Sequence, residues 1–428
     1  MFDTLAPEPA GIGTGARITL RRQQRGLSRK VLAQLVGRSE EWLRLVESGR
    51  RRLDSIETLM RLADALRIDD VNELIDFPDS RTAHDLLPGQ EIVSAFQQVM
   101  LDRSFVTAGA AMPAEPTSTG GLLPELEECQ QIWHRSPHRY DQLHHRLPGL
   151  LGSVRRTQWR SRTTANDELL MRTYHLSHHM LGALGAYSLG WTAADRAMGC
   201  ACRLDRPETL AASAWHIGWA LLHLGQPADC YRSALDQIAH LGKTANSADA
   251  NTLRGALYLL AADAAAHNAE SAAAAELLDR AARIAQDMNR DSQAYGIVFG
   301  PTTINLARID IALRRNHIAD ALRIATGTTL TGGYHLTGRI EFFVTLASIY
   351  ERHGDDVAAT FALARAADLA PHDIALDRAA HTLLQQLVQH GNPLITPELH
   401  RLVALCRPRA RRWNRRTGPT ISLATHDS

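Results

Sequence analysis

One group of histidines in the sequence has the spacing of metal ligands. His175, His178 and His179 lie at positions i, i+3 and i+4 of one predicted helix, so two or three imidazoles share a face. No Glu or Cys accompanies them at a fitting spacing. Cys200 and Cys202 are two residues apart on another predicted helix and point to different sides. We therefore predict core or surface histidines and no metal site.

The sequence carries no motif that supports catalysis. Residues Tyr187 to Gly190 (YSLG) faintly resemble the turn that presents a serine nucleophile, but that turn must follow a β-strand, and none is predicted here. A phosphate-binding glycine loop, an HExxH zinc motif and a dinucleotide fingerprint are also missing. The sequence therefore predicts a protein that is not an enzyme and that needs no cofactor.

Basic residues near the N-terminus could bind phosphate groups. Between Gly15 and Arg67 there are 13 Arg and Lys residues against 6 Asp and Glu residues, a net charge of +7. The whole chain has a net charge of only +1, so the remainder is acidic overall. A local positive region of this kind is typical of a domain that contacts nucleic acid.

Five short helices are predicted to position these charges. Ser28 and Ser39 precede the second and third helices as N-caps, and Asp54 with Glu57 has the pattern of a capping box. Gly37 leaves only a short turn between the second and third helices, which is the spacing of a helix-turn-helix. The five predicted helices cover residues 16–25, 29–36, 40–48, 54–66 and 70–75.

The run LSRKVLAQLVGRSEEWLRLVESGRRRLDSIETLMRLADAL resembles the lambda-repressor-like helix-turn-helix of the XRE class. It has that family's L-S-x-x-x-L-A pattern, a glycine turn, and a short helix ending in E-x-G. The resemblance covers about 60 residues and implies a buried ion pair between Arg22 and Glu47. It also implies that Arg29, Glu40, Glu41 and Leu45 face DNA. With neighbouring residues, the predicted DNA-binding set is Arg29, Lys30, Ser39, Glu40, Glu41, Trp42, Arg44, Leu45, Arg50, Arg51 and Arg52.

Glu40 and Glu41 stand where related domains often carry Gln, Arg, Ser or Thr, and three interpretations stay open. The carboxylates stabilise the helix N-terminus, an effect of about 0.3–1 kcal/mol. Alternatively, one of them accepts a hydrogen bond from cytosine N4 while Leu45 contacts a thymine methyl group. In the third interpretation the helix meets a protein instead of DNA. Two interpretations of Trp42 also stay open: it contacts DNA, or it packs half-buried against the second helix.

Length and composition indicate a soluble protein of two or three domains. The chain has 428 residues, and its five cysteines are scattered and odd in number, which suits reduced thiols in a cytosol. The N-terminus has no basic start followed by an apolar segment, so we predict no signal peptide. No run approaches the roughly 20 apolar residues of a membrane span. We therefore predict a cytoplasmic protein that does not contact a membrane.

The rest of the chain is predicted to form helical repeats. Residues 107–124 are rich in Pro, Gly, Ser and Thr and read as a flexible linker. Later helices come in pairs, and residues 346–371 carry small and aromatic residues at tetratricopeptide spacing. The predicted fold is therefore all-α, a five-helix domain followed by an α-solenoid. Predicted helices of the repeats include residues 138–147, 168–186, 270–288, 303–314 and 373–390. The predicted domains are the helix-turn-helix domain at 15–76, a helix and linker at 77–124, the repeats at 125–413 and a disordered tail at 414–428.

This layout resembles actinobacterial regulators that join an XRE domain to tetratricopeptide-like repeats, on the phrases YSLGWTAADRA, WALLHLGQPADC and FGPTTINLARIDIAL. It is also similar in layout to the RRNPP peptide-sensing regulators. The resemblance implies a sequence-specific transcriptional regulator that binds double-stranded DNA. The alternative is an interaction scaffold in which the small domain docks a protein.

Two partners follow from the predicted architecture. One small domain makes few base contacts, so we expect a homodimer, held by the repeats, on an inverted repeat with half-sites roughly 34 Å apart. The inner helices of a solenoid line its concave face, where a peptide or small-molecule effector would bind. Acidic residues there favour a cationic ligand, although the two tryptophans could instead fill the core between pairs. The predicted ligand set is Trp215, Trp219, Tyr258, Asp310, Glu341, Ser348 and Glu351.

Overall fold

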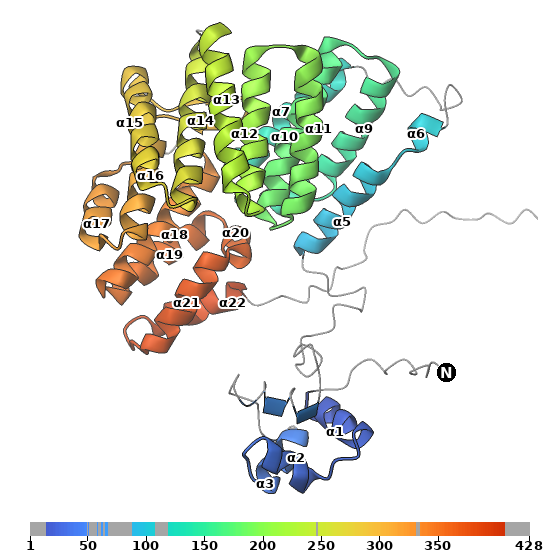
Figure 1. Cartoon of the computed structure of the whole chain (residues 1–428), viewed down its shortest axis with the longest axis vertical. Helices are drawn as coiled ribbons and strands as arrows, with labels where there is room; N and C mark the ends of the chain where they lie inside the picture. The colour runs from blue at the N-terminus through green and yellow to red at the C-terminus, as the bar shows by residue number, and fades with distance from the viewer. Residues whose placement is uncertain are drawn as a thin grey trace, which may run out of the picture. The chain divides into compact units, whose positions relative to one another are not determined.

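The structure, a computed structural model, describes residues 14–48, 50, 58, 61–62, 65–66, 88–107, 119–244, 247–330 and 334–406. The chain divides into two units, Met1–Leu86 and Leu87–Ser428, and each has its own hydrophobic core. Helices form almost all of the described secondary structure, which confirms the all-α prediction (Figure 1). In the described part of the chain, no helix combines the length and apolarity that a membrane span requires.

The first unit contains three helices that agree with the predicted ranges. They are α1 (Thr14–Gln24), α2 (Arg29–Leu35) and α3 (Glu40–Glu47). Short helical stretches also occur within the predicted fourth helix, and the predicted fifth helix, 70–75, lies outside the described residues. The core of the unit is built from one apolar face of each helix, namely Ile18, Leu32, Ala33, Val36, Leu43, Val46, Leu62 and Leu66.

The second unit is a series of antiparallel helix pairs, preceded by five described helices, of which α7 and α9 pack on α10 (Figure 1). The opening helices are α5 (Pro88–Leu101), α6 (Ser104–Thr107), α7 (Thr119–Arg135), α8 (Arg139–Leu143) and α9 (Arg146–Arg160). The pairs are α10 (Thr164–Ala183) with α11 (Tyr187–Leu204), α12 (Pro207–His223) with α13 (Pro227–Thr244), α14 (Ala248–His267) with α15 (Ser271–Met288), α16 (Pro301–Arg314) with α17 (Ile318–Gly327), and α18 (Leu336–His353) with α19 (Asp356–Leu369). Three helices end the described chain: α20 (Pro371–Leu376), α21 (Arg378–His390) and α22 (Thr396–Cys406).

Glycines let the first helices of successive pairs approach closely. A Cβ atom on Gly182 of α10 would lie 2.6 Å from the Trp219 ring of α12. A Cβ atom on Gly218 of α12 would likewise lie 2.6 Å from Leu260 of α14. Because the glycines leave this space empty, large side chains of the next pair fill it, and the cores of neighbouring pairs become continuous.

Several helices differ from the predicted ones. Helix α9 was not predicted; its Pro148 is in the first turn, where a proline is tolerated. The predicted helix 373–390 is two helices, since the Asp377 carboxylate accepts hydrogen bonds from the amides of Ala379 and Ala380 and caps α21. Helix α7 begins at Thr119, inside the predicted linker. The predicted tail, 414–428, lies outside the described residues.

A β-hairpin between α15 and α16 was not predicted. Its strands are β1 (Ser292–Ala294) and β2 (Ile297–Phe299), joined antiparallel by a two-residue turn at Tyr295 and Gly296. Phe299 is fully buried against α14, where a Cβ atom on Gly255 would lie 2.1 Å from the ring. The three-residue strands are too short for an alternating pattern to be recognised in the sequence.

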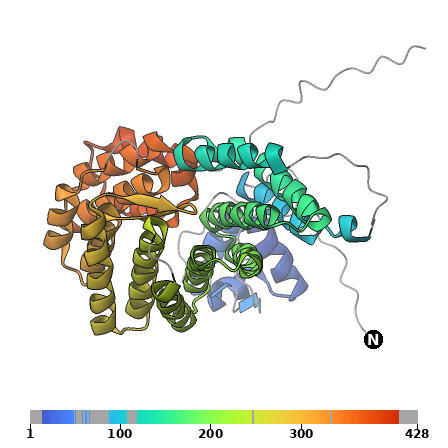
Figure 2. The same cartoon turned by 90° about the horizontal axis from the view of Figure 1, so that it is seen from above.

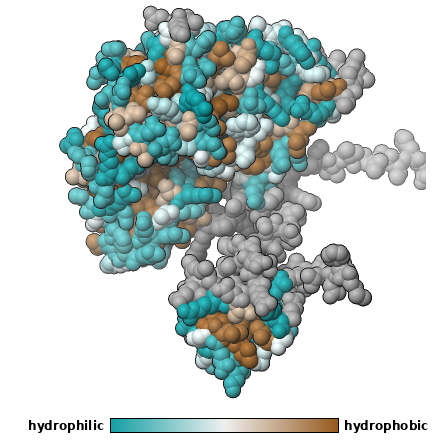
Figure 3. All heavy atoms as spheres, viewed as in Figure 1, coloured by the Kyte–Doolittle hydropathy of each residue, from teal (hydrophilic) through white to brown (hydrophobic). Residues whose placement is uncertain are grey.

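The curvature of the repeats brings the start and the end of the second unit together. Helix α7 contacts α18, and the hairpin extends over the inner side of the curve (Figure 2). Gln293 of the hairpin lies 3.2 Å from His134 of α7, measured between Nε2 atoms. In Figure 3 the visible apolar residues of the repeat unit are scattered among hydrophilic ones. The inner side of the unit is therefore bounded by α7, the hairpin and the first helices of the pairs.

Candidate functional site

Helices α2 and α3 have the local geometry of a helix-turn-helix. Ser28 and Ser39 cap them as predicted, because their hydroxyls accept hydrogen bonds from the amides of Val31 and Trp42 at 3.2 and 3.1 Å. Gly37, at φ +69°, allows the tight turn between the helices, because this backbone conformation strains any residue with a side chain. The turn holds the two helices at a fixed angle with one face of α3 exposed.

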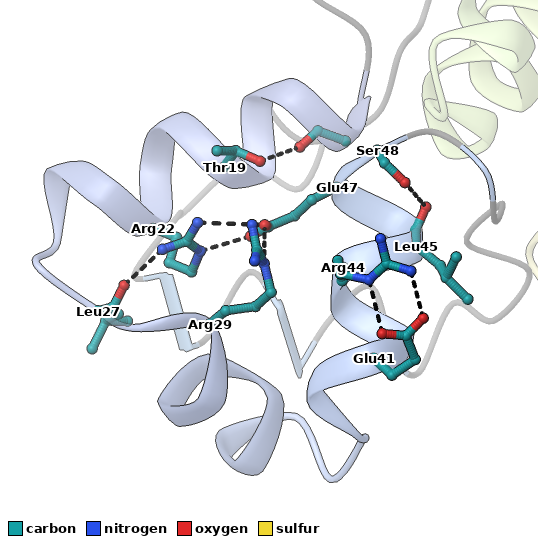
Figure 4. A network of polar contacts seen from close by, with 10 residues as sticks. Thr19, Arg22, Leu27, Arg29, Glu41, Arg44, Leu45, Glu47 and Ser48 are labelled. Carbon is teal, nitrogen blue, oxygen red and sulfur yellow. Dashed lines mark hydrogen bonds and ion pairs between the residues drawn. The ribbon is translucent and has the colours of Figure 1, made fainter.

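The Glu47 carboxylate at the end of α3 connects all three helices (Figure 4). Arg22 of α1 donates to it from Nε at 2.6 Å, and Arg29 of α2 donates from Nε at 2.7 Å. Arg22 also donates to the Leu27 carbonyl at 3.0 Å. The resemblance implied the Arg22–Glu47 pair but placed Arg29 on DNA. In the structure Arg29 pairs with Glu47 inside the domain, and its side chain is 37% exposed.

Glu41 and Arg44 form an ion pair on the exposed face of α3 (Figure 4). Arg44 donates from Nε to Oε2 of Glu41 at 2.8 Å and from Nη2 to Oε1 at 2.6 Å. The hydrogen bond from Arg44 holds the pKa of Glu41 below its usual range. The pair neutralises one of the two acidic charges at the start of α3, a contact that none of the three sequence interpretations included.

The other predicted DNA-binding residues are distributed around α2 and α3. Trp42 and Leu45 are half-buried, and Arg51 and Arg52 lie outside the described residues. Arg38 was not predicted as a functional residue: its guanidinium lies 5.6 Å from the Trp42 ring centroid and donates to the Thr58 hydroxyl at 3.1 Å. The remaining predicted residues are exposed, namely Lys30, Ser39, Glu40 and Arg50.

The predicted ligand residues in the repeats are distributed over α12, α14, α16 and α18. Trp219 fills the space beside Gly182 and stacks on His223 with ring centroids 3.7 Å apart, the packing role that the sequence left open. Trp215 is half-buried near His179, and Asp310 is exposed and paired with Arg314 at 2.7 Å. The others lie on two helices, Tyr258 on α14 and Glu341, Ser348 and Glu351 on α18.

Four histidines form a buried cluster between α10 and α12. His175 stacks on His216 with centroids 4.0 Å apart, and His178 and His179 lie 5.0 and 4.8 Å from His216. His178 Nδ1 lies 3.1 Å from the Gly190 carbonyl oxygen. Burial lowers the pKa of His175 to about 3 and that of His178 to about 4, so both are neutral at pH 7. Within the described residues, no three His, Cys, Asp or Glu side chains are placed to hold a metal ion.

A polar cavity of about 530 Å³ opens on the inner side of the repeat unit. It is lined by α7, α10, the start of α14 and the turn of the hairpin. The cavity was not predicted, because residues far apart in the chain meet there. We call it the hairpin cavity, and its charged and aromatic lining includes Glu127, Arg135, Glu168, Arg172, Asp249 and Tyr295.

A comparison with protein families agrees with the helix-turn-helix geometry of the first unit. Residues 15–74 match the family described as helix-turn-helix domain. A comparison with curated protein sequences gave no significant match. The similar solved structures include the following three, each at low identity. The first is PlcR of Bacillus thuringiensis in complex with the peptide PapR7 and DNA, at 13% identity and TM-score 0.33 over 81% of this chain and 98% of PlcR.

The other two structures also align with most of their own length. A tetratricopeptide repeat protein of Parabacteroides merdae has 12% identity and a TM-score of 0.41 over 70% of this chain and 99% of that protein. ComR of S. thermophilus, in complex with DNA and its signalling peptide ComS, has 16% identity and a TM-score of 0.29. That alignment covers 65% of this chain and 94% of ComR.

Proposed function

We propose that the protein is a sequence-specific DNA-binding regulator of transcription in the cytoplasm, and that α3 is its recognition helix. The observation that carries this proposal is the helix-turn-helix at residues 15–74, whose exposed face holds Lys30, Arg44 and Arg50. Its buried face is fixed by the Glu47 ion pairs, so the exposed side chains are presented on a rigid support. Exposed cations hold phosphates, and the first turns of a recognition helix contact base edges.

The Glu41–Arg44 pair supports a specific mode of base recognition. Glu41 occupies Nε and one hydrogen of Nη2, which leaves Nη1 and the second Nη2 hydrogen free to contact guanine O6 and N7. Orienting Arg44 in advance lowers the entropy cost of that contact. Glu40, which is exposed, is then the carboxylate that accepts from cytosine N4.

The repeat unit supplies dimerisation and signal response in this proposal. A single domain of this size makes few base contacts, so two copies on an inverted repeat, roughly 34 Å apart, are needed for high specificity. The repeat unit is a separate structural unit whose described residues form hydrophobic cores of their own, with a polar cavity on its inner side. A ligand there changes DNA affinity by favouring one arrangement of the dimer.

The second candidate function is a scaffold whose small domain docks a protein. It is favoured by Val31 and Leu35, which are 42% and 58% exposed one turn apart on α2. Two exposed apolar residues make a small surface compared with a stable protein interface. We therefore place this function second.

Selection of bound genomic fragments by the full chain, followed by binding to single-base variants of the selected site, tests the proposal. We expect an enriched inverted repeat. Arg44→Ala should reduce the preference for guanine at one position of each half-site by about 1–3 kcal/mol. Glu41→Gln should reduce the preference at the same position. Glu40→Gln should change a different, cytosine position. Glu276→Gln, which breaks an exposed pair with Arg280 on α15, is the matched control. Failure to enrich any DNA, with a folded small domain, would favour the scaffold.

A further inference from the structure

Three charged groups of the hairpin cavity have no internal partner among the described residues. They are the carboxylates of Glu127 and Asp249 and the guanidinium of Arg135, and all three are exposed. Two other charged side chains of the lining have partners within the protein. Arg172 donates a hydrogen bond to Gln130 at 3.0 Å, and Glu168 accepts one from Arg206 at 2.6 Å. The cavity therefore offers unpaired groups of both signs within one concave surface.

The hairpin turn places an aromatic ring in the same cavity at a conformational cost. Tyr295 has φ +51°, a left-handed backbone that favours Gly, Asn and Asp at this turn position. Its half-buried side chain packs against the two cores on either side, so surrounding contacts hold the strained turn. Strained residues of this kind concentrate at binding sites, where they fix a side chain for a ligand.

We propose that the hairpin cavity binds a small zwitterion with a cationic side group, either arginine itself or a short peptide that contains arginine. The cation is taken by Asp249 and Glu127, the carboxylate is taken by Arg135, and the Tyr295 ring covers the ligand through a cation–π contact. The polar lining fits a ligand of this kind, and 530 Å³ is within the usual size range of ligand sites. This inference rests on the proposed signal response of the repeat unit and names its ligand.

The cavity also provides a physical link to the rest of the unit. Arg135 and Glu127 belong to α7, Asp249 to α14, and Tyr295 to the hairpin, so one ligand contacts three elements. Helix α7 in turn contacts α18 near the end of the repeats. A ligand that connects α7 to α14 therefore stabilises the curved form of the repeat unit, in which both ends are in contact.

Calorimetric titration of the full chain, without DNA, tests the ligand class with three probes. These are L-arginine, a glycine-arginine-glycine tripeptide, and agmatine, which is arginine without its carboxylate. We expect saturable binding of arginine or the tripeptide, and the tighter of the two identifies free amino acid or peptide as the source. Agmatine should bind about tenfold more weakly, since Arg135 loses its partner. No saturable binding of any probe, or equal binding of agmatine, would overturn the proposal.

Variants then test the residues. Asp249→Asn and Arg135→Gln should each weaken binding about tenfold or more, whereas Asp229→Asn, an exposed change on α13, should not. Tyr295→Asn removes the ring while keeping a residue that suits the left-handed turn, so relief of backbone strain offsets part of the lost packing, and the variant should bind more weakly. Wild-type affinity in Asp249→Asn and Arg135→Gln would contradict the site. Because these titrations contain no DNA, a failure of DNA binding counts against the proposed function alone.

Discussion

The guanidinium of Arg139 donates a hydrogen bond to the carboxylate of Asp373, which follows it by 234 residues in the chain. Both side chains are buried, at 1% and 9% exposure. Arg139 also donates to the Thr337 hydroxyl at 2.7 Å and lies 4.0 Å from the Trp133 ring centroid. This ion pair joins the opening helices of the repeat unit to its last helices.

Removing Arg139 should destabilise the repeat unit strongly. Arg139→Met leaves the Asp373 charge buried without its cation, a change that costs about 3–5 kcal/mol of unfolding free energy. Adding Asp373→Leu should recover much of the loss, because no buried charge is then left alone. Urea unfolding of both variants, with Arg280→Met as an exposed control, measures the effect. A loss no larger than that of the control would contradict the structural role of the pair.

Glu47 should matter for the fold of the small domain, while Glu41 on the same helix should not. Glu47→Gln breaks ion pairs with Arg22 and Arg29 and leaves Arg22, 10% exposed, without a carboxylate. We expect a loss on the order of 3–5 kcal/mol for Glu47→Gln and a much smaller loss for Glu41→Gln, because the Glu41–Arg44 pair is exposed to solvent. Hydrogen exchange of the α1–α3 amides measures both. Equal protection in the two variants would show that the Glu47 network does not hold the helices together.

The hairpin position depends on a glycine in α14. Gly255→Ala forces a Cβ atom to 2.1 Å from the Phe299 ring, and overpacking of this kind costs about 1–3 kcal/mol. Gly121→Ala in α7 is the matched control, since nothing lies within 4 Å of its added Cβ atom. That control should be neutral or stabilising by up to about 1 kcal/mol. Similar melting temperatures for both variants would be inconsistent with the close Gly255–Phe299 packing.

The buried histidines predict a loss of stability in acid. The folded pKa values of His175 and His178, about 3 and 4, lie below the ordinary 6.5, because burial disfavours the charged imidazole. The unfolded chain therefore binds more protons below pH 6.5, so stability is complete above that pH and falls as the pH drops to about 4. Each histidine contributes a slope of up to about 1.4 kcal/mol per pH unit. His178→Gln should reduce the slope measured by denaturant titration; an unchanged slope would contradict the assignment.

The small domain could be predicted in detail because its signals are local. Ser28, Ser39 and Gly37 determine where α2 and α3 begin and end through contacts within a few residues. The Glu41–Arg44 pair is also local, three residues apart on one helix, but its formation depends on side-chain rotamers that a charge count does not reveal. The sequence therefore indicated the two helices of the candidate site and missed the Glu41–Arg44 pair on one of them.

The inner side of the repeats could not be predicted because it depends on contacts between distant residues. The hairpin cavity combines α7, α10, α14 and a hairpin, and their meeting depends on the curvature of the whole unit. The predicted ligand set came from aligning degenerate repeats by their turns, and that alignment does not reveal that Trp219 fills the space beside Gly182. The histidine cluster could be predicted only in part. Three members share one predicted helix, whereas the fourth, His216, comes from the next helix pair.

The most direct test of the account is the salt dependence of DNA binding by the full chain, measured on a duplex selected from genomic fragments. If Lys30 and Arg50 hold phosphates, each change to alanine should reduce the slope of log affinity against log salt concentration by about 0.9. Arg280→Ala, an exposed change in the repeat unit, should leave the slope unchanged. A steep wild-type slope that falls in Lys30→Ala and Arg50→Ala is the predicted result. Absence of DNA binding, or slopes that these two changes leave untouched, would contradict the assignment of α2 and α3 as a DNA-reading surface.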